Sequence, residues 1–167
     1  MHTLANAEAT SVKGQVINVG MGQIATGDRS TQFTSVLGSC VAVVLWHPRL
    51  SLGAIAHVVL PKSHGQNGQP GKFADTAIPT MLEQLARMGC PKPGLVAKIA
   101  GGANMFRVGG PLQIGDDNIA TVREILKTVG IPITAEDVGG TQGRKITFTC
   151  STGELRIEVA GQKAKVI

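Results

Sequence analysis

Two continuous apolar runs, residues 40–46 and 53–61, stand out in the hydrophobic pattern of the chain. The first run is apolar at every position, and its short length is typical of a strand that is covered on both faces. The connection between the runs, residues 48–52, is short enough to predict that they are antiparallel neighbours. Strand alternation places four side chains of the first run on one face: Cys40, Ala42, Val44 and Trp46.

Helical periodicity follows in two later segments. The first is predicted to begin with a cap at Asp75 or Thr76, and Pro79 is tolerable there only if it lies in the first turn. The second is predicted to begin with a cap at Asp116 or Asp117. Each segment carries aliphatic side chains at helical spacing, which indicates one buried face.

Shorter apolar or alternating runs predict strands at residues 13–25, 95–100, 131–138, 145–150 and 155–159. Glycines interrupt the first of these runs, which indicates two short strands or one bent strand. Short turns join the last three runs, so we expect an antiparallel portion of sheet there. The order of elements predicts an α+β fold, with a mixed and antiparallel β-sheet sandwich as its core and two or three α-helices outside.

The composition fits a single folded domain at residues 13–167, preceded by a flexible N-terminal segment at residues 1–12. Hydrophobic residues make up 43% of the chain and charged residues 16%, which is enough apolar surface for a packed core. Aromatic residues are only 3%, so the core is expected to be aliphatic, and stacking platforms for single-stranded nucleic acid are lacking.

The formal net charge is +5, with Lys and Arg scattered along the chain, which favours an acidic protein partner over nucleic acid. Three cysteines without a Cys-x-x-Cys motif indicate a reducing compartment, and the four histidines lack the spacing of a metal site. No apolar run approaches the ~20 residues that cross a bilayer. We therefore expect a cytoplasmic protein without membrane insertion, bound metal or cofactor.

The two candidate catalytic residues are Cys40 and His57. Cys40 begins the first apolar run, and His57 lies in the middle of the second. Gly38 permits a sharp turn just before the cysteine, and the N–H groups of Ser39 and Cys40 could face a developing oxyanion. Directly opposed side chains on neighbouring strands lie about 5 Å apart at Cβ, which suits a thiol–imidazole pair. Free cysteine and a lone histidine in apolar strands are, however, more often core residues than catalytic ones.

A glycine-rich segment follows the predicted strand at residues 95–100. It consists of Gly101, Gly102, Ala103, Asn104, Met105 and Phe106. The segment lacks the Gly-x-Gly-x-x-Gly nucleotide fingerprint. Its small residues would let a substrate backbone approach, and Met105 and Phe106 would offer an apolar contact to a partner. The alternative is a tight turn with both side chains pointing inward.

Five ordered motifs resemble the chemoreceptor glutamine deamidase family, CheD, over about residues 13–159. They are Leu37-Gly-Ser-Cys-Val41, His57-Val-Val-Leu-Pro61, Lys98-Ile-Ala-Gly-Gly-Ala-Asn-Met105, Ile114-Gly-Asp-Asp-Asn118 and Gly139-Gly-Thr-Gln-Gly-Arg-Lys145. The resemblance implies that Cys40 is the nucleophile, His57 the general base and Thr34 the polar third member that positions the histidine. Ala100 stands where many members carry a larger residue.

The resemblance also implies an activity, a substrate and partners. The activity is that of a protein-glutamine glutaminase, a hydrolase that converts glutamine side chains of methyl-accepting chemotaxis receptors to glutamate through a thioester and releases ammonia. A CheC-type phosphatase is implied as a second partner, and no cofactor is required. Two alternatives stay open: a non-catalytic adaptor that binds receptors or the phosphatase, and peptide-bond cleavage or transglutamination by the same cysteine and histidine.

Overall fold

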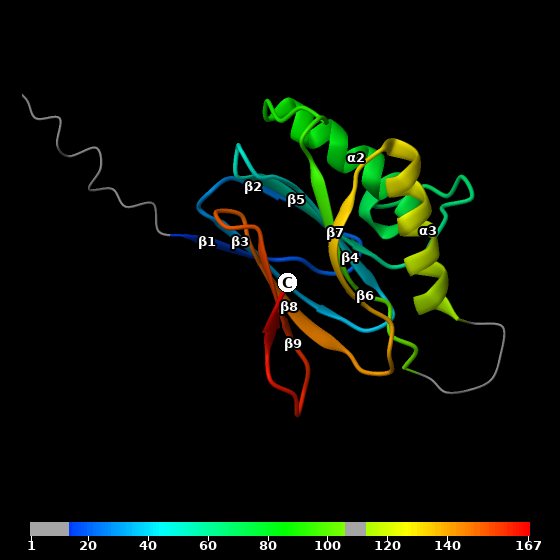
Figure 1. The fold of residues 1–167 in the computed structure, drawn as a ribbon. Coiled ribbons are helices and arrows are strands. Elements are labelled where there is room, and N and C mark those ends of the chain that lie inside the picture. The colour runs from blue at the N-terminus through cyan, green and yellow to red at the C-terminus, as the bar shows by residue number, and fades with distance from the viewer. Residues whose placement is uncertain (1–13, 106–112) are drawn as a thin grey trace, which may run out of the picture.

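The computed structural model describes residues 14–105 and 113–167, which form two β-sheets and a layer of helices (Figure 1). The outer sheet has five strands, in the order β1 (Gln15–Asn18), β3 (Thr31–Leu37), β8 (Arg144–Thr149), β9 (Glu154–Glu158) and β10 (Lys165–Val166). The central sheet also has five, in the order β2 (Ile24–Gly27), β5 (Leu52–Val58), β4 (Val41–His47), β6 (Val96–Gly101) and β7 (Ile133–Val138). The predicted segment 1–12 lies outside the described residues.

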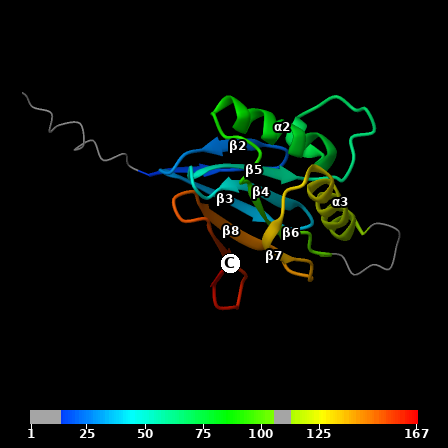
Figure 2. The ribbon, with the colours of Figure 1, turned by 45° about the horizontal axis from the view of Figure 1, so that its top comes forward.

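The helices cover the face of the central sheet that points away from the outer sheet. They are the 3₁₀-helix η1 (Pro70–Lys72), α2 (Ala74–Arg87) and α3 (Ile114–Val129). Both α-helices lie on one side of the molecule, away from β8 and β9 (Figures 1 and 2). The central sheet is thus buried on both faces, as its continuous apolar runs predict. The α+β sandwich with helices outside is confirmed.

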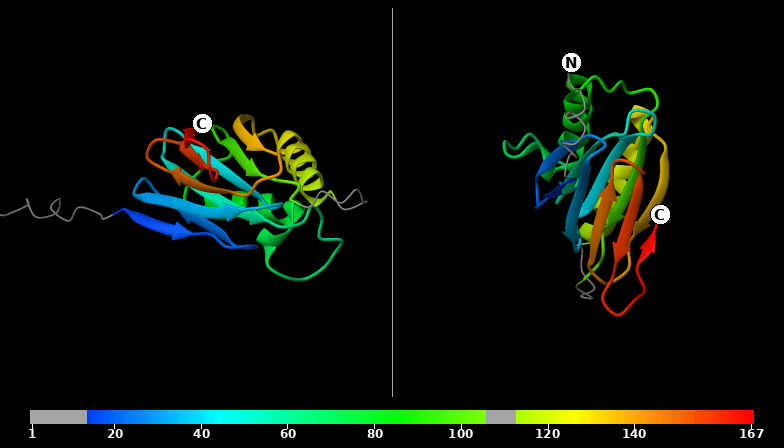
Figure 3. Two further views of the ribbon diagram at one scale, coloured as in Figure 1. Left: turned by 90° about the horizontal axis from the view of Figure 1, so that it is seen from below. Right: turned by 90° about the vertical axis from the view of Figure 1, so that its left-hand side faces the viewer.

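Both sheets are mixed. In the outer sheet β1 runs parallel to β3, and the two lie side by side in Figure 3 (left). In the central sheet β6 runs parallel to β7, while β4 pairs antiparallel with both β5 and β6. The predicted antiparallel pairing of the two apolar runs is therefore confirmed.

The alternation predicted for β4 is also confirmed by the packing. Cys40, Ala42 and Val44 belong to the core between the two sheets, where they join outer-sheet side chains such as Phe33 and Phe148. The intervening side chains of β4 belong to the core beneath the helices: Val41, Val43 and Leu45. The apolar period of two in the sequence thus divides the protein into two cores.

One predicted neighbour relation is wrong. The short loop after β7 does not make an antiparallel pair of β7 and β8, because β7 lies in the central sheet and β8 in the outer sheet. Gly139 and Gly140 both have positive φ, at 85° and 77°, so the chain turns there and crosses between the layers. The pairing of β8 with β9 is antiparallel as predicted.

The predicted helix caps are wrong as well. The α2 helix begins at Ala74 after Phe73, and no side chain caps it. Asp75 instead accepts hydrogen bonds from the N–H and hydroxyl of Ser63, and Pro79 lies inside the helix rather than in its first turn. The α3 helix begins at Ile114, so the predicted caps lie within its first turn, where carboxylates are favourable beside the helix N-terminus.

Candidate active site

Cys40 and His57 lie on one face at one end of the central sheet, as diagonal rather than directly opposed neighbours. Ala42 lies directly opposite His57 in the β4–β5 register, so Cys40, two residues earlier, is the diagonal neighbour on the same face. Diagonal neighbours are about 7–8 Å apart at Cα and somewhat closer at Cβ. Among the hydrogen bonds of the described residues, none joins the Cys40 thiol to the imidazole. The structure therefore places the pair on one face without a direct hydrogen bond between them.

Both side chains are buried, with 7% of Cys40 and 4% of His57 exposed. Burial raises the pKa of the Cys40 thiol above its ordinary value. Burial also lowers the pKa of the His57 ring, and the hydrogen bond to the Val19 carbonyl partly opposes this effect. At neutral pH the resting pair is accordingly a neutral thiol beside a neutral imidazole.

The Nδ1 atom of His57 is held by two groups. It lies 3.1 Å from the Val19 carbonyl oxygen and 2.9 Å from Ser35 Oγ, and the Ser35 hydroxyl donates to the same carbonyl at 2.7 Å. A carbonyl oxygen can only accept, and the hydroxyl proton of Ser35 is already directed at it, so Nδ1 must carry the ring proton. This tautomer leaves Nε2 with its lone pair, ready to accept a proton.

The side chain of Thr34 lies on the opposite face of β3 from Ser35, because successive strand residues alternate. No hydrogen bond among the described residues joins the Thr34 side chain to His57. Thr34 acts on the ring through its main chain, since its carbonyl accepts the Val19 N–H at 2.8 Å and Val19 in turn accepts from the ring. The hydroxyl that contacts Nδ1 is that of Ser35.

Two residues beside the site are missing from the sequence-based prediction: Ser35 and Asn118. Ser35 lies between Phe33 and Leu37 on the inward face of β3, so a hydroxyl between two large apolar side chains is the signal that marks it. Asn118 is fully buried in α3, and its side chain donates to the carbonyls of Ser39 and Val59. Its signal is an amide on the apolar face of a helix.

The loop after β6 packs directly on the turn that carries Cys40. Gly102 N–H donates to the Cys40 carbonyl at 2.8 Å, and Ala103 N–H donates to the Gly38 carbonyl at 3.0 Å. The Met105 sulfur lies so close to Gly38 that a Cβ there would be 2.7 Å from it, so a larger residue at this position would displace the end of the Met105 side chain. Residues 101–103 are buried, so they support the turn rather than face solvent.

Met105 is 50% exposed beside this turn, so its side chain does not point inward as the alternative of a tight turn would have it. Asn104, the residue before it, bonds through its side chain to Asp116 at the start of α3 and through its N–H to the Gly140 carbonyl. Phe106 lies outside the described residues. The part of the predicted loop that the structure describes is therefore brought to the site, with Met105 as its exposed apolar side chain.

Arg144 holds the loop that receives Asn104. Its guanidinium donates to the main-chain carbonyls of Asp137, Gly139 and Gln142, and pairs with the Asp137 carboxylate at 2.5 Å. Lys165 lies 2.5 Å from the other oxygen of Asp137. Burial alone would raise the pKa of Asp137, but the hydrogen bonds and charges of Lys165 and Arg144 together lower it.

We expect Arg144→Met to lower the free energy of unfolding by about 3 kcal/mol, because it leaves the largely buried Asp137 carboxylate with Lys165 alone and several main-chain carbonyls without their donor. Arg123→Met is the matched control. It removes an exposed ion pair with Glu136 and should cost at most about 1 kcal/mol. Urea unfolding of both variants measures the difference, and equal losses would contradict the assigned role of Arg144.

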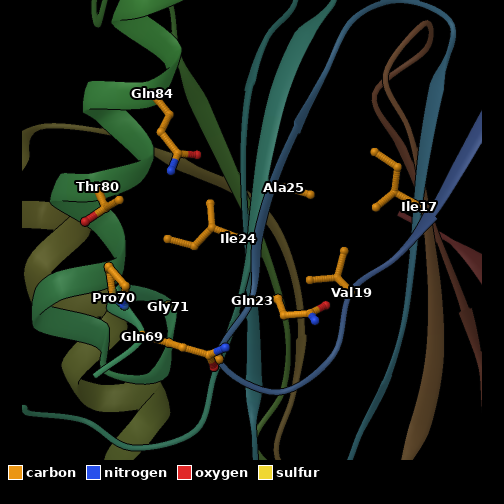
Figure 4. Close-up of a pocket in the computed structure, with 11 residues that line it drawn as sticks. Ile17, Val19, Gln23, Ile24, Ala25, Gln69, Pro70, Gly71, Thr80 and Gln84 are labelled. Carbon is orange, nitrogen blue, oxygen red and sulfur yellow. The ribbon is translucent and has the colours of Figure 1, made fainter. Parts of the chain in front are cut away.

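A pocket of about 410 Å³ lies next to the histidine, between α2 and the segment that joins β1 to β2. Figure 4 shows Thr80 and Gln84 of α2 on one side of it and Val19 and Gln23 on the other. The Gln23 carbonyl accepts the main-chain N–H of His57 at 3.1 Å, so the pocket adjoins the main chain that carries the imidazole ring. Its lining includes neither Cys40 nor His57.

The described residues contain no group of three or more His, Cys, Asp or Glu side chains that could hold a metal ion. In the same part of the chain, none of the helices is long and apolar enough to span a bilayer.

Residues 59–159 match the family described as CheD, chemotactic sensory transduction. Similar proteins include a probable chemoreceptor glutamine deamidase CheD of Methanococcus vannielii, 40% identical over 85% of this chain and 94% of that protein. The chemoreceptor glutamine deamidase CheD of Thermotoga maritima is 46% identical over 75% of this chain and 79% of that protein. The solved structure of Bacillus licheniformis hypothetical protein YfiH overlaps at a TM-score of 0.47 with 17% identity, covering 75% of this chain and 59% of that one.

Proposed function

Because the chain belongs to the CheD family of chemotactic sensory transduction proteins, we propose that it is a chemoreceptor glutamine deamidase with Cys40 as its nucleophile. The substrate is the side-chain carboxamide of glutamine in a chemoreceptor, and the products are a glutamate side chain and ammonia. The receptor substrate assigns the reaction to the cytoplasm. A CheC-type phosphatase is proposed as a second partner.

The first half of the reaction forms a thioester. As Cys40 Sγ attacks the carboxamide carbon, His57 Nε2 takes the thiol proton, and the carbonyl oxygen becomes an oxyanion that the Cys40 N–H stabilises. The tetrahedral intermediate then collapses: its C–N bond breaks, the imidazolium gives its proton to the leaving nitrogen, and ammonia departs. The substrate carbon is left bonded to sulfur, and the ring is neutral again.

The second half hydrolyses that thioester. Nε2 takes a proton from water, and the resulting hydroxide equivalent attacks the thioester carbon. The C–S bond breaks, and the thiolate recovers its proton from the imidazolium. The free enzyme and a glutamate side chain result, so one water is consumed for each ammonia released, and no cofactor enters the cycle.

One observation carries this proposal: the hydrogen bonds at Nδ1 fix the tautomer in which Nε2 is the proton acceptor, on the same face of the central sheet as Cys40. The residual exposure of Cys40 supports attack on a carboxamide that enters from the surface. Catalytic hydrogen bonds are often long before substrate binds, so a missing thiol–imidazole bond is compatible with this role.

The test is to incubate the purified protein with a cytoplasmic chemoreceptor fragment and to measure free ammonia together with peptide masses. Ammonia and an amide-to-acid mass change on glutamine are expected. Receptor binding without ammonia would instead support the adaptor, for which the exposed Met105 offers a contact. Fragmented receptor would indicate a protease, and receptor cross-linked to an amine would indicate transglutamination.

We expect Ser35→Ala to lower kcat about 2- to 10-fold, because one of two hydrogen bonds at Nδ1 is lost while the Val19 carbonyl remains. Thr34→Val is the matched comparison on the same strand and should stay near wild type. Steady-state ammonia release by the two variants decides between the neighbouring hydroxyls. A larger loss in Thr34→Val would return the positioning role to that side chain.

A further inference from the structure

We propose that Asn118 is a positioning residue of this active site, which orients the peptide between Ser39 and Cys40 so that the Cys40 N–H faces the reacting carbonyl oxygen. This inference rests on the proposed deamidase reaction. Asn118 does not itself touch the substrate in this scheme. It acts through the main chain of the nucleophile.

The hydrogen bonds of Asn118 determine which way its side-chain amide faces. Nδ2 lies 3.1 Å from the Ser39 carbonyl oxygen and 2.9 Å from the Val59 carbonyl oxygen. Both partners are acceptors, so the amide nitrogen, and not the amide oxygen, must face them. The two N–H bonds of one buried side chain are therefore both committed to main chain at the site.

The amide of Asn118 is satisfied at its nitrogen only. Asn118 is fully buried, and its Oδ1 atom is without a partner among the described residues. A buried acceptor without a partner costs about 1–3 kcal/mol, which offsets part of what the two donated hydrogen bonds contribute to stability. A costly buried amide whose donors both reach the active-site main chain indicates a functional role.

The peptide geometry follows from these bonds. The Ser39 carbonyl points toward α3, which covers the face of the central sheet opposite to the one that carries Cys40 and His57. In a trans peptide the N–H points opposite to the C=O, and the described residues contain no cis peptide bond. The Cys40 N–H is thus directed to the side on which the thiol and the imidazole lie.

The Cys40 N–H also makes no hydrogen bond to a neighbouring strand among the described residues. When the β4–β6 register is continued by one residue beyond the ladder, Cys40 pairs with Gly102. The Gly102 N–H donates to the Cys40 carbonyl. The reciprocal bond of a regular antiparallel pair is missing, and no other hydrogen bond in residues 14–105 and 113–167 uses the Cys40 N–H. Gly101 and Gly102, with φ of 108° and 70°, turn the chain away at this point.

The second bond of Asn118 connects the nucleophile to the base. Val59 follows His57 by two residues, and its N–H bonds to Lys72 rather than to β4. The β4–β5 ladder ends at the Val41–Val58 pair, so it does not tie Val59 to the Cys40 turn. Asn118 supplies that tie, so one amide sets the main chain at Cys40 and beside His57 together.

The test compares Asn118→Ala and the similarly sized Asn118→Leu with Val122→Ala, a fully buried control on the same helix whose apolar side chain donates no hydrogen bond. We expect kcat for ammonia release to fall about 10²-fold in both Asn118 variants, with KM changed less than about threefold. Alkylation of Cys40 by iodoacetamide should keep its wild-type rate, because that reaction forms no oxyanion. Val122→Ala should retain kcat even if its midpoint of thermal unfolding falls.

Parallel losses of alkylation and of kcat in both Asn118 variants, or a loss in Val122→Ala as large as theirs, would reduce Asn118 to a structural residue. Full kcat in either folded Asn118 variant would also overturn the proposal. Cys40→Ala is measured beside them. If Cys40→Ala still releases ammonia, the deamidase mechanism has failed, whereas an inactive Cys40→Ala with an active Asn118→Ala rejects only the positioning role.

Discussion

Cys40→Ala is expected to abolish ammonia release from chemoreceptor fragments, with a residual rate no higher than that of the fragment alone. The substitution removes the atom that forms the thioester, so no slower version of the same covalent path remains. A colorimetric or enzyme-coupled ammonia assay, run for many turnovers of wild-type protein, measures the loss. Receptor binding should persist in the variant, because the substitution removes a single buried atom.

Cys90→Ala is the matched control for that loss. Cys90 is also a free, buried cysteine whose pKa is raised by burial, but it belongs to the core beneath the helices, away from the face that carries His57. We expect wild-type kcat for this variant. Ammonia release that survives in Cys40→Ala, or that disappears equally in Cys90→Ala, would remove Cys40 from the role of nucleophile.

His57→Gln is expected to lower kcat by about 10²- to 10⁴-fold, which is the usual contribution of a positioned acid–base group. Glutamine approximates the volume of the ring and can still donate to the Val19 carbonyl, so packing and fold should be retained. It cannot carry a proton between sulfur and the leaving nitrogen. Far-ultraviolet circular dichroism checks the fold, and stopped assays measure the rate.

The pH profile gives a second measure of the same residue. Because the His57 pKa is lowered, the ring is neutral above about pH 6.5, and kcat/KM should fall only at lower pH, as the ring becomes protonated and can no longer accept the thiol proton. Because the Cys40 pKa is raised, the alkaline limb should begin above its ordinary value of 9.0, where the pair loses the proton that ammonia needs. His57→Gln should lack the acid limb. A wild-type acid limb centred above pH 7 would contradict the neutral resting pair.

The parts of the fold that the sequence predicts well are those in which local pattern and tertiary contact agree. The run at residues 41–47 is apolar on both faces because the helices cover one face and the outer sheet the other. The layer crossing after Val138 could not be predicted, because two glycines indicate a sharp turn without indicating which sheet receives the next strand. The predicted helix caps were wrong because loop contacts, such as that of Ser63 with Asp75, outweigh the local capping preference.

For the candidate site, local sequence pattern indicates only some of the residues. Cys40 and His57 can be chosen from turn chemistry and from the pairing of two short runs. The contact at Nδ1 cannot be predicted from the sequence, because it depends on which face of β3 points inward and on the main chain of Val19. Val19 lies 38 positions before His57. Asn118 lies 79 and 59 positions from the two residues whose carbonyls it binds, so only the packing of α3 on the central sheet brings them together.

Burial of the Cys40 side chain also determines how the protein withstands oxidants. Hydrogen peroxide attacks thiolates far faster than thiols, and a buried cysteine with a raised pKa offers little thiolate at neutral pH. The proposed nucleophile is therefore protected from sulfenic acid formation between turnovers. We therefore expect peroxide to oxidise Cys40 more slowly than a cysteine that is held as a preformed thiolate.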